Sequence, residues 1–307
     1  MNVYRSLQEV ADAEAHLGSF GLALGVFDGF HLGHQAVIGA ARGAGRVGVL
    51  TFDPHPAEVF SPGNSPRRIL GSIDHQIKVL EELGLDFLVV LEFTREFAAI
   101  PAEEFAQLLI ATGVQRLAAG YDWNFGKGRT GNVDRLKKWA GDITVEKVEA
   151  ILLGGEPISS TRIRDALASG DLERAAQFLG RPYSIYGEVR QGRQLGRQLG
   201  FPTANVAAEE TFLPANGVYA IQGKWNNESN ERIPGVANVG TRPTVDDSMK
   251  RSLEVHLFSN AVPDCYGWEL EVGFLSKIRE ETKFNGVDDL KAQIAQDIET
   301  ARGITKA

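Results

Sequence analysis

The pattern of apolar residues changes near Gly180, and this change constrains the fold more than any other feature of the 307-residue chain. Before it, short apolar runs alternate with segments of helical periodicity, which predicts parallel strands joined by helices. After it, helical periodicity stops and Gly, Pro and Asn become frequent, which predicts an antiparallel sandwich or small barrel. We therefore expect two domains, residues 1–182 and 183–307, that meet within residues 180–183.

Apolar runs and helical spacing define the expected elements. In the first half, strands are expected at 20–27, 46–52, 86–91, 114–119 and 143–148, and helices at 34–42, at 72–83 and from Pro101 onward. In the second half, strands are expected at 184–189, 217–222, 235–239, 253–258 and 268–274. A closing helix at 287–301 would have Leu290, Ile294 and Ile298 on one face.

Composition excludes several classes of protein. The net charge of -8 argues against a general nucleic-acid binder, which would carry a basic face. No stretch approaches about 20 uninterrupted apolar residues, so no membrane span is expected. The single cysteine excludes an internal disulfide and fits a reducing compartment, and residues 1–14 lack a signal-peptide pattern. We therefore expect a cytoplasmic protein.

Two histidines stand in a glycine-containing turn directly after the first apolar strand. Gly29 and Gly33 permit a tight turn, and the helix expected after it would direct its free N–H groups at the turn. There His31 and His34 can donate hydrogen bonds to phosphate oxygens and stabilise a departing pyrophosphate during nucleotidyl transfer. The alternative is a plain glycine turn with two surface histidines.

Hydroxyl and guanidinium side chains gather at residues 159–164, where a loop enters a helix. Ser160 and Thr161 could simply cap that helix. Together with Arg162 and Arg164 they exceed what a cap needs and could hold a triphosphate by charge-assisted hydrogen bonds. We favour phosphate binding because the cluster shares a domain with the two histidines.

Ligands of open α/β sheets bind at the carboxyl ends of the strands, and two polar segments lie there. One contains Asp53, at the end of the second strand. The other, residues 120–131, contains Trp123 and Phe125, which could stack on a planar ring while Asp122 or Asn124 sets its orientation. The alternative is that either aromatic residue belongs to the core.

The first half resembles the FMN adenylyltransferase module of bacterial bifunctional riboflavin kinase/FAD synthetases. The resemblance rests on Gly-Val-Phe-Asp-Gly-x-His-x-Gly-His at 25–34, Phe-Asp-Pro-His-Pro at 52–56, the glycine-rich run at 122–131 and Ile-Ser-Ser-Thr-x-Ile-Arg at 158–164. It implies a Rossmann-like nucleotidyltransferase fold and ATP-phosphate binding by His31 and His34. The ATP- and phosphate-binding residues expected in this half are Gly25, Phe27, Asp28, Gly33, Ser160, Thr161, Arg162 and Arg164. The expected flavin-binding residues are Asp53, Asp122, Trp123, Asn124, Phe125 and Arg129.

The second half opens with a glycine-rich run that ends in Pro202-Thr203-Ala-Asn205. Thr203 and Asn205 are two residues apart, so they project to the same side of an extended segment. A hydroxyl and an amide oxygen are hard ligands that suit Mg²⁺, which would keep waters and nucleotide phosphates for its other positions. An ordinary glycine-rich hairpin is the alternative.

Glu254 lies in an alternating strand that places Glu254, His256 and Phe258 on the face opposite Leu253, Val255 and Leu257. A carboxylate that faces a pocket could accept the proton of an alcohol attacking phosphorus. The alternative is a solvated strand face, and His256 is interpreted as structural.

The second half resembles the riboflavin kinase module of the same family. The resemblance is carried by residues 187–205, 214–219, 238–244, 253–256, 266–267 and 279–284 and by the closing helix. It implies a six-stranded Greek-key barrel, Thr203 and Asn205 as Mg-nucleotide residues, Glu254 as the catalytic base and Arg279 in a loop near the flavin. Gly192, Gly196, Gly200 and Pro202 complete the expected nucleotide site. Loop 259–266 departs from the family pattern, and its Cys265 is interpreted as packing.

The expected function is therefore that of a bifunctional enzyme. It would phosphorylate riboflavin with ATP to give FMN, and would adenylate FMN with a second ATP to give FAD and pyrophosphate. Its expected partners are riboflavin, FMN, ATP and Mg²⁺, without nucleic acid or membrane, and self-association is left open. The rival functions are an adenylyltransferase with a degenerate barrel and a non-enzymatic flavin-storage protein.

Overall fold

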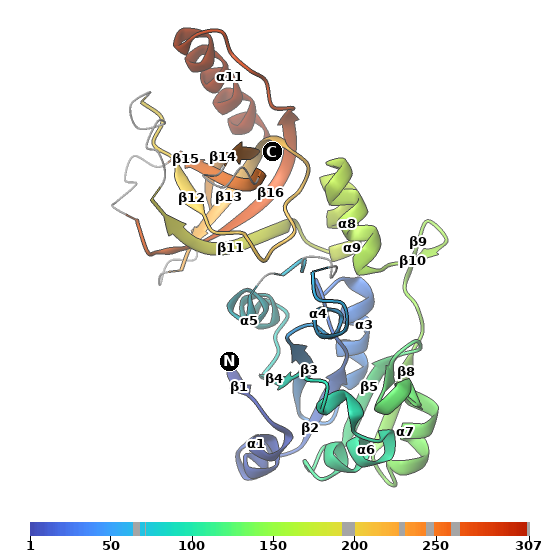
Figure 1. The fold of residues 1–307 in the computed structure, drawn as a ribbon. Helices are drawn as coiled ribbons and strands as arrows, with labels where there is room; N and C mark the ends of the chain where they lie inside the picture. The colour runs from blue at the N-terminus through green and yellow to red at the C-terminus, as the bar shows by residue number, and fades with distance from the viewer. Residues whose placement is uncertain are drawn as a thin grey trace. The chain divides into compact units, whose positions relative to one another are not determined.

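The structure is a computed structural model that describes residues 1–63, 68–70, 72–191, 200–226, 231–243, 249–258 and 265–305. Its chain forms two compact units, residues 1–66 with 76–159 and residues 67–75 with 160–307 (Figure 1). The expected domain boundary at 182/183 stays a prediction.

The first unit is built on a six-stranded parallel sheet with the order β1-β4-β3-β2-β5-β8. The strands are β1 (Asn2–Tyr4), β2 (Phe20–Leu24), β3 (Arg46–Asp53), β4 (Phe87–Glu92), β5 (Arg116–Gly120) and β8 (Thr144–Val148). All five predicted strands are present, and the short edge strand β1 was not predicted. Because β2 pairs with β3 on one side and β5 on the other, the strand order reverses beside β2, where open α/β sheets bind ligands.

Helices and short hairpins connect these strands. The helices are α1 (Leu7–Asp12), α2 (Glu14–Leu17), α3 (Leu32–Ala41), α4 (Pro56–Phe60), α5 (Ile73–Glu82), α6 (Ala102–Ile110) and α7 (Val133–Trp139), with 3₁₀ turns η1 (Phe97–Ala99) and η2 (Lys127–Arg129). The hairpins are β6 (Asn124–Phe125) with β7 (Gly131–Asn132) and β9 (Leu152–Leu153) with β10 (Glu156–Pro157). Strand β2 is apolar along its whole length because both faces of the sheet are covered: its Phe20 and Leu22 are fully buried, as is Leu117 of β5.

The second unit is a closed six-stranded antiparallel barrel with the order β11-β12-β15-β14-β13-β16. Its strands are β11 (Tyr183–Arg190), β12 (Ala204–Val206), β13 (Gly217–Trp225), β14 (Ile233–Pro243), β15 (Met249–Leu257) and β16 (Glu269–Arg279). Helices α8 (Ser160–Ser169) and α9 (Leu172–Leu179) precede the barrel, and α11 (Val287–Thr305) follows it. The barrel and its closing helix confirm the predicted fold.

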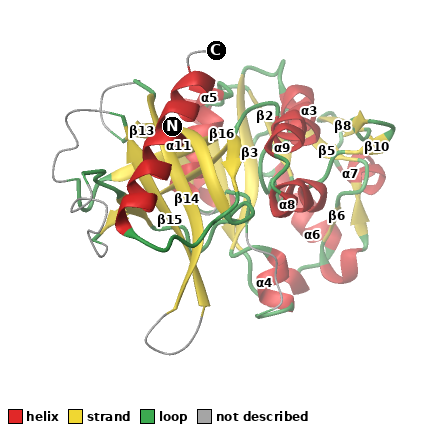
Figure 2. Ribbon diagram, turned by 90° about the horizontal axis from the view of Figure 1, so that it is seen from above, coloured by secondary structure: helices red, strands yellow, loops and turns green. Residues whose placement is uncertain are grey.

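Helix α11 packs along the outside of the barrel, where Figure 2 shows it lying across β13 and β14. Ile298 and Ala301 are buried there against Ala220 of β13 and Val236 of β14, with Ile294 beside them. The apolar face of this helix is the one that the sequence pattern predicted.

Residues 68–75 lie far from the barrel in sequence but pack within its unit. The backbone N–H of Phe212 donates to the carbonyl of Arg68 over 2.8 Å. His75 is fully buried, and its Nε2 lies 3.0 Å from Oγ of Ser184 in β11.

Candidate functional sites

The chain turns sharply between β2 and α3. Phe27 and Phe30 adopt left-handed backbone conformations, with φ of 53° and 45°, and both are buried. Such conformations cost a bulky residue free energy and persist only where neighbouring contacts enforce them. This turn delivers His31 to the N-cap position of α3, where its Nδ1 accepts the backbone N–H of His34 over 3.3 Å.

Two side chains hold this turn from neighbouring elements. The hydroxyl of Thr51, a buried residue of β3, donates to the carbonyl of Val26 over 2.7 Å. The amide of Gln35 in α3 donates to the carbonyl of Phe30 over 2.9 Å. The turn is therefore supported at both ends by hydrogen bonds from the sheet and from the helix.

The imidazole rings of His31 and His34 are stacked, with centroids 3.6 Å apart and an angle of 18° between the planes. Burial, and to a lesser extent the neighbouring His31, lower the pKa of His34 well below its ordinary value. The ring of His34 is therefore neutral near pH 7. Its Nδ1 is buried and has no hydrogen-bond partner among the described residues, so a ligand oxygen or a water would have to satisfy it.

Glycine at position 33 leaves room for the ring of His31. A Cβ atom there would stand only 3.0 Å from Cε1 and 3.1 Å from Nδ1 of His31. A larger residue would require this ring to shift by a few tenths of an ångström. The spacing of the two histidines and the glycine thus has a steric reason as well as a chemical one.

A cavity of about 930 Å³ opens beside this turn at the carboxyl ends of the strands. His34, Gly25 and Phe27 line it, as do Asp122, Trp123, Asn124, Phe125 and Arg129 of the predicted flavin set. Asp28 is buried beside the turn and Asp53 ends β3, but neither lines the cavity. The structure therefore brings most of the predicted residues of this unit together.

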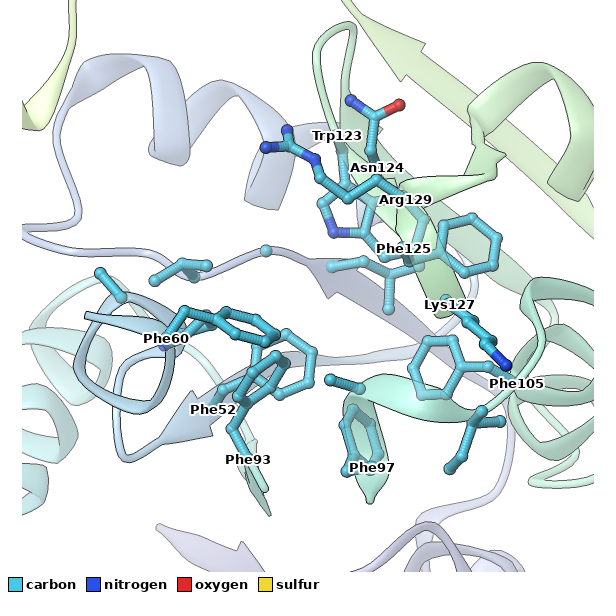
Figure 3. A pocket seen from close by; sticks show the side chains of 18 of the residues that line it. Phe52, Phe60, Phe93, Phe97, Phe105, Trp123, Asn124, Phe125, Lys127 and Arg129 are labelled. Atoms are coloured by element: carbon cyan, nitrogen blue, oxygen red, sulfur yellow. The ribbon is translucent and has the colours of Figure 1, made fainter. Parts of the chain in front are cut away.

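Many aromatic side chains line the cavity (Figure 3). Phe52, Phe60 and Phe93 gather on one side, opposite Trp123, Asn124 and Arg129. Phe97 and Lys127 also line the cavity. The sequence analysis missed Phe52, Phe60, Phe93, Phe97 and Lys127, although several of them follow strand ends, where ligand-binding loops are expected.

The two predicted stacking residues have different surroundings. Trp123 and Phe125 are themselves stacked, with centroids 4.4 Å apart. Phe125 also packs against Phe105 and Trp139 in the core and is only 7% exposed. Phe125 is therefore closer to a core residue than Trp123 is.

The predicted phosphate cluster lies in the first turns of α8, which belongs to the second unit. Ser160 and Thr161 begin the helix. The guanidinium of Arg162 lies 4.7 Å from the ring centroid of Phe178 in α9, a cation–π contact that ties α8 to α9. That these residues bind phosphate together with His31 and His34 stays a prediction.

A second cavity, of about 330 Å³, lies in the barrel unit. Thr203, Glu254 and Arg279 of the predicted set line it. Asn205 lies directly opposite Glu254 in the pairing of β12 with β15. Leu253, Val255 and Leu257 are buried on the other face of β15, which confirms the predicted alternation.

The remaining predicted residues of this half have varied settings. Gly200 has a φ of 90°, and the carbonyl of Pro202 lies 2.8 Å from Nδ1 of His256. Cys265 is buried. Gly192 and Gly196 lie outside the described residues, as do residues 259–264 of the divergent loop.

Arg279 is the last residue of β16 rather than part of a loop, which corrects the placement that the resemblance implied. It is drawn into the strand pairing because Val218 of β13 is its partner. Its guanidinium is bound by the carboxylate of Asp297 in α11, another lining residue that the sequence analysis missed.

The barrel cavity offers oxygen donors for a hard cation. No group of three His, Cys, Asp or Glu side chains that could hold a metal ion occurs in the part of the chain that the structure describes. The hydroxyl of Thr203 and the amide oxygen of Asn205 have the chemistry that Mg²⁺ accepts, since this ion takes a few oxygen ligands from a protein and completes its shell with phosphates and water.

Comparison with known proteins gives one consistent result. A family model described as FAD synthetase matches residues 14–162, and one described as riboflavin kinase matches residues 179–305. Bifunctional riboflavin kinase/FMN adenylyltransferase from Escherichia coli is 41% identical over 93% of both chains. The proteins of that name from Haemophilus influenzae (42% identity, 92% of both chains) and Bacillus subtilis (38% identity, 91% of this chain and 90% of the relative) are also similar.

A solved structure shares the whole fold. The crystal structure titled macrolide-efflux protein from Streptococcus pneumoniae superposes with a TM-score of 0.81 at 31% identity and covers 98% of both chains. Among the described helices of the present chain, none is long and apolar enough to cross a membrane.

Proposed function

This chain belongs to the family of bifunctional riboflavin kinase/FMN adenylyltransferases, and we propose that it uses the 930 Å³ cavity for adenylyl transfer and the barrel cavity for riboflavin phosphorylation. The enzyme makes FMN from riboflavin and FAD from FMN. We divide the two activities between residues 1–182 and 183–307, as the order of the matching family models supports.

Adenylyl transfer joins the phosphate of FMN to the AMP part of ATP. An oxygen of the FMN phosphate attacks the α-phosphorus, and the bond to the bridging oxygen breaks as pyrophosphate leaves. Negative charge builds on the leaving pyrophosphate, which N–H groups at the start of α3 and the imidazoles of His31 and His34 would stabilise. The observation that carries this assignment is that His34 lines the cavity in the first turn of α3, with its buried Nδ1 bonded to no described residue.

The aromatic side of the same cavity suits the flavin ring. Phe52, Phe60 and Phe93 provide a broad apolar surface, while Asn124 and Arg129 stand across from them (Figure 3). A planar heterocycle gains burial and stacking on the aromatic side, and a phosphate is attracted to the guanidinium. We propose Ser160, Thr161 and Arg164 as further phosphate-binding residues from their motif alone.

Riboflavin phosphorylation in the barrel needs a base and charge neutralisation. Glu254 would accept the proton of the ribityl hydroxyl as its oxygen attacks the γ-phosphorus of ATP and ADP leaves. Thr203 and Asn205 would hold Mg²⁺, which neutralises phosphate charge when it is bound. The opposition of Asn205 and Glu254 in neighbouring strands supports this division of roles.

We also propose a cellular compartment and a set of ligands for the enzyme. ATP as a substrate and the single cysteine support a cytoplasmic enzyme whose partners are riboflavin, FMN, ATP and Mg²⁺, without nucleic acid or membrane.

The test follows the flavins formed from riboflavin, ATP and Mg²⁺ after chromatographic separation. With His34→Ala, FMN should accumulate without FAD. With Glu254→Gln, riboflavin should stay unchanged while supplied FMN still becomes FAD. Loss of both activities in either variant, with the fold retained by circular dichroism, would overturn the assignment of separate sites.

A further inference from the structure

Helix α11 contributes a buried carboxylate to the wall of the barrel cavity. The side chain of Asp297 is 5% exposed, and the cavity is also lined by Thr203 and Glu254. An ionised carboxylate at such a depth is stable only if it is paired and hydrogen-bonded. Its partner is Arg279, at the end of β16.

The contact between Arg279 and Asp297 is bidentate. Nε of Arg279 donates to Oδ1 over 2.9 Å and to Oδ2 over 3.1 Å, and Nη2 donates to Oδ2 over 2.8 Å. The amide of Gln293, one turn earlier in α11, donates to Oδ1 over 3.0 Å. Paired N–H···O bonds of this kind fix the plane of the guanidinium as well as its position.

The rest of the guanidinium faces the segment after β16. Nη1 donates to the carbonyl of Glu280 over 3.0 Å, and the guanidinium carbon lies 5.7 Å from the ring centroid of Phe284. Arg279 has five N–H groups. Nη1 and Nη2 each carry one further N–H that donates to no described residue. Arg279 and Phe284 both line the cavity.

We propose that Asp297 is a positioning residue for the kinase reaction. It holds Arg279 in one orientation, so that a flat cation beside an aromatic ring forms a fixed part of the wall that receives riboflavin. The closing helix is then part of the substrate site and not only a cover for the barrel. This inference rests on the proposed assignment of the kinase reaction to the barrel cavity.

A purely structural role would have a different signature. If the pair only fastened α11 to the barrel, its loss would lower stability and reduce the amount of active enzyme, which leaves the KM for riboflavin unchanged. If the pair positions Arg279, its loss acts through substrate binding and orientation. Misplacement of a binding group costs about 10- to 100-fold in kcat/KM.

The experiment compares Asp297→Asn, Asp297→Glu and Glu299→Ala in the full-length enzyme. Asp297→Asn keeps the shape and removes the charge. Glu299→Ala is the matched control, since it removes an exposed ion pair with Arg302 on the same helix. Melting temperature and FAD formation from supplied FMN, measured on the same preparations, report on folding.

We expect Asp297→Asn to raise the KM for riboflavin at least about 10-fold, with little change in the KM for ATP and normal FAD formation. Asp297→Glu should recover part of the loss, and Glu299→Ala should behave as wild type. In an Arg279→Ala background, Asp297→Asn should have no further effect on the KM, because the two residues act as a unit.

The proposal would be overturned if Asp297→Asn had the wild-type KM for riboflavin. It would also be overturned if Asp297→Asn raised this KM by the same factor in the wild-type enzyme and in the Arg279→Ala variant. Glu254→Gln in the same assay tests the assignment of the cavity itself. If Glu254→Gln keeps full kinase activity, the proposed function fails; if only the Asp297 variants behave as wild type, the positioning role fails.

Discussion

Asn205 of β12 and Glu254 of β15 face each other directly across two hydrogen-bonded strands of the barrel. Residues opposed in this way have their Cβ atoms about 5 Å apart and project to the same side of the sheet. The pairing therefore places an amide oxygen beside a carboxylate without help from a loop. Thr203 directly precedes β12 and lines the barrel cavity together with Glu254.

Replacing Asn205 should weaken the response of the kinase to Mg²⁺. In Asn205→Ala an oxygen ligand is lost while Glu254 remains, so we expect the Mg²⁺ concentration for half-maximal FMN formation to rise about 10-fold or more. The measurement is a Mg²⁺ titration of FMN formation at fixed ATP. FAD formation from supplied FMN serves as the control. An unchanged titration curve would remove Asn205 from the metal site.

Thr51 offers a test of the turn that carries the two histidines. Thr51→Val keeps the shape but leaves the carbonyl of Val26 without its buried donor, which costs about 1–3 kcal/mol. Because Phe27 and Phe30 are held in unfavourable conformations, we expect the turn to relax and FAD formation to fall at least about 10-fold. Thr51→Ser, which retains the hydroxyl, should keep most activity.

The kinase activity of the same Thr51 preparations provides the folding control, since the barrel does not contain this turn. Equal adenylyltransferase activity in the valine and serine variants would show that the hydroxyl has no positioning role.

The lowered pKa of His34 predicts how stability depends on pH. The folded-state pKa lies below the ordinary value of 6.5, so the unfolded chain takes up its proton first as the pH falls. The contribution of His34 is therefore complete above about pH 6.5 and is lost as the pH falls from there through the folded-state pKa. His34→Gln removes this titration and should lose less stability than wild type over the same range.

Denaturant unfolding of the two proteins at about pH 7.5 and about pH 5.5 makes this comparison. Tryptophan fluorescence follows the unfolding of both units, since Trp123 and Trp139 lie in the first unit and Trp225 and Trp268 in the second. An identical loss of stability in wild type and His34→Gln would contradict a depressed pKa.

Much of the fold could be predicted from the sequence because both periodicities are strong. Strand β2 is apolar along its length, and residues 253–257 of β15 alternate strictly, so the type and the buried face of these strands follow directly. The three-residue strand β1 carries no such signal. Residues 68–75 pack within the barrel unit through single contacts such as that of His75 with Ser184. The periodicity of a sequence does not predict contacts between segments that are distant along the chain.

The candidate sites could be predicted in part because motifs contain several of their residues. Motif residues such as His34, Glu254 and Thr203 line the two cavities. Phe60 and Phe93 were missed because an isolated phenylalanine in a short helix or a loop is typical of ordinary packing. Only the tertiary structure shows that such residues border a cavity rather than the core.

Phe60 provides a last test, because its side chain is 56% exposed although it lines the cavity. A large apolar side chain left accessible at a cavity wall gains burial when a ligand covers it, about 1.5–3 kcal/mol for a complete loss of exposure. Phe60→Ala should therefore raise the KM for FMN about 10-fold with the KM for ATP little changed. Leu152→Ala is the matched control, since Leu152 is equally exposed at 57% and does not line the cavity. If both variants bind FMN as wild type does, the flavin does not lie against the Phe52–Phe60–Phe93 side.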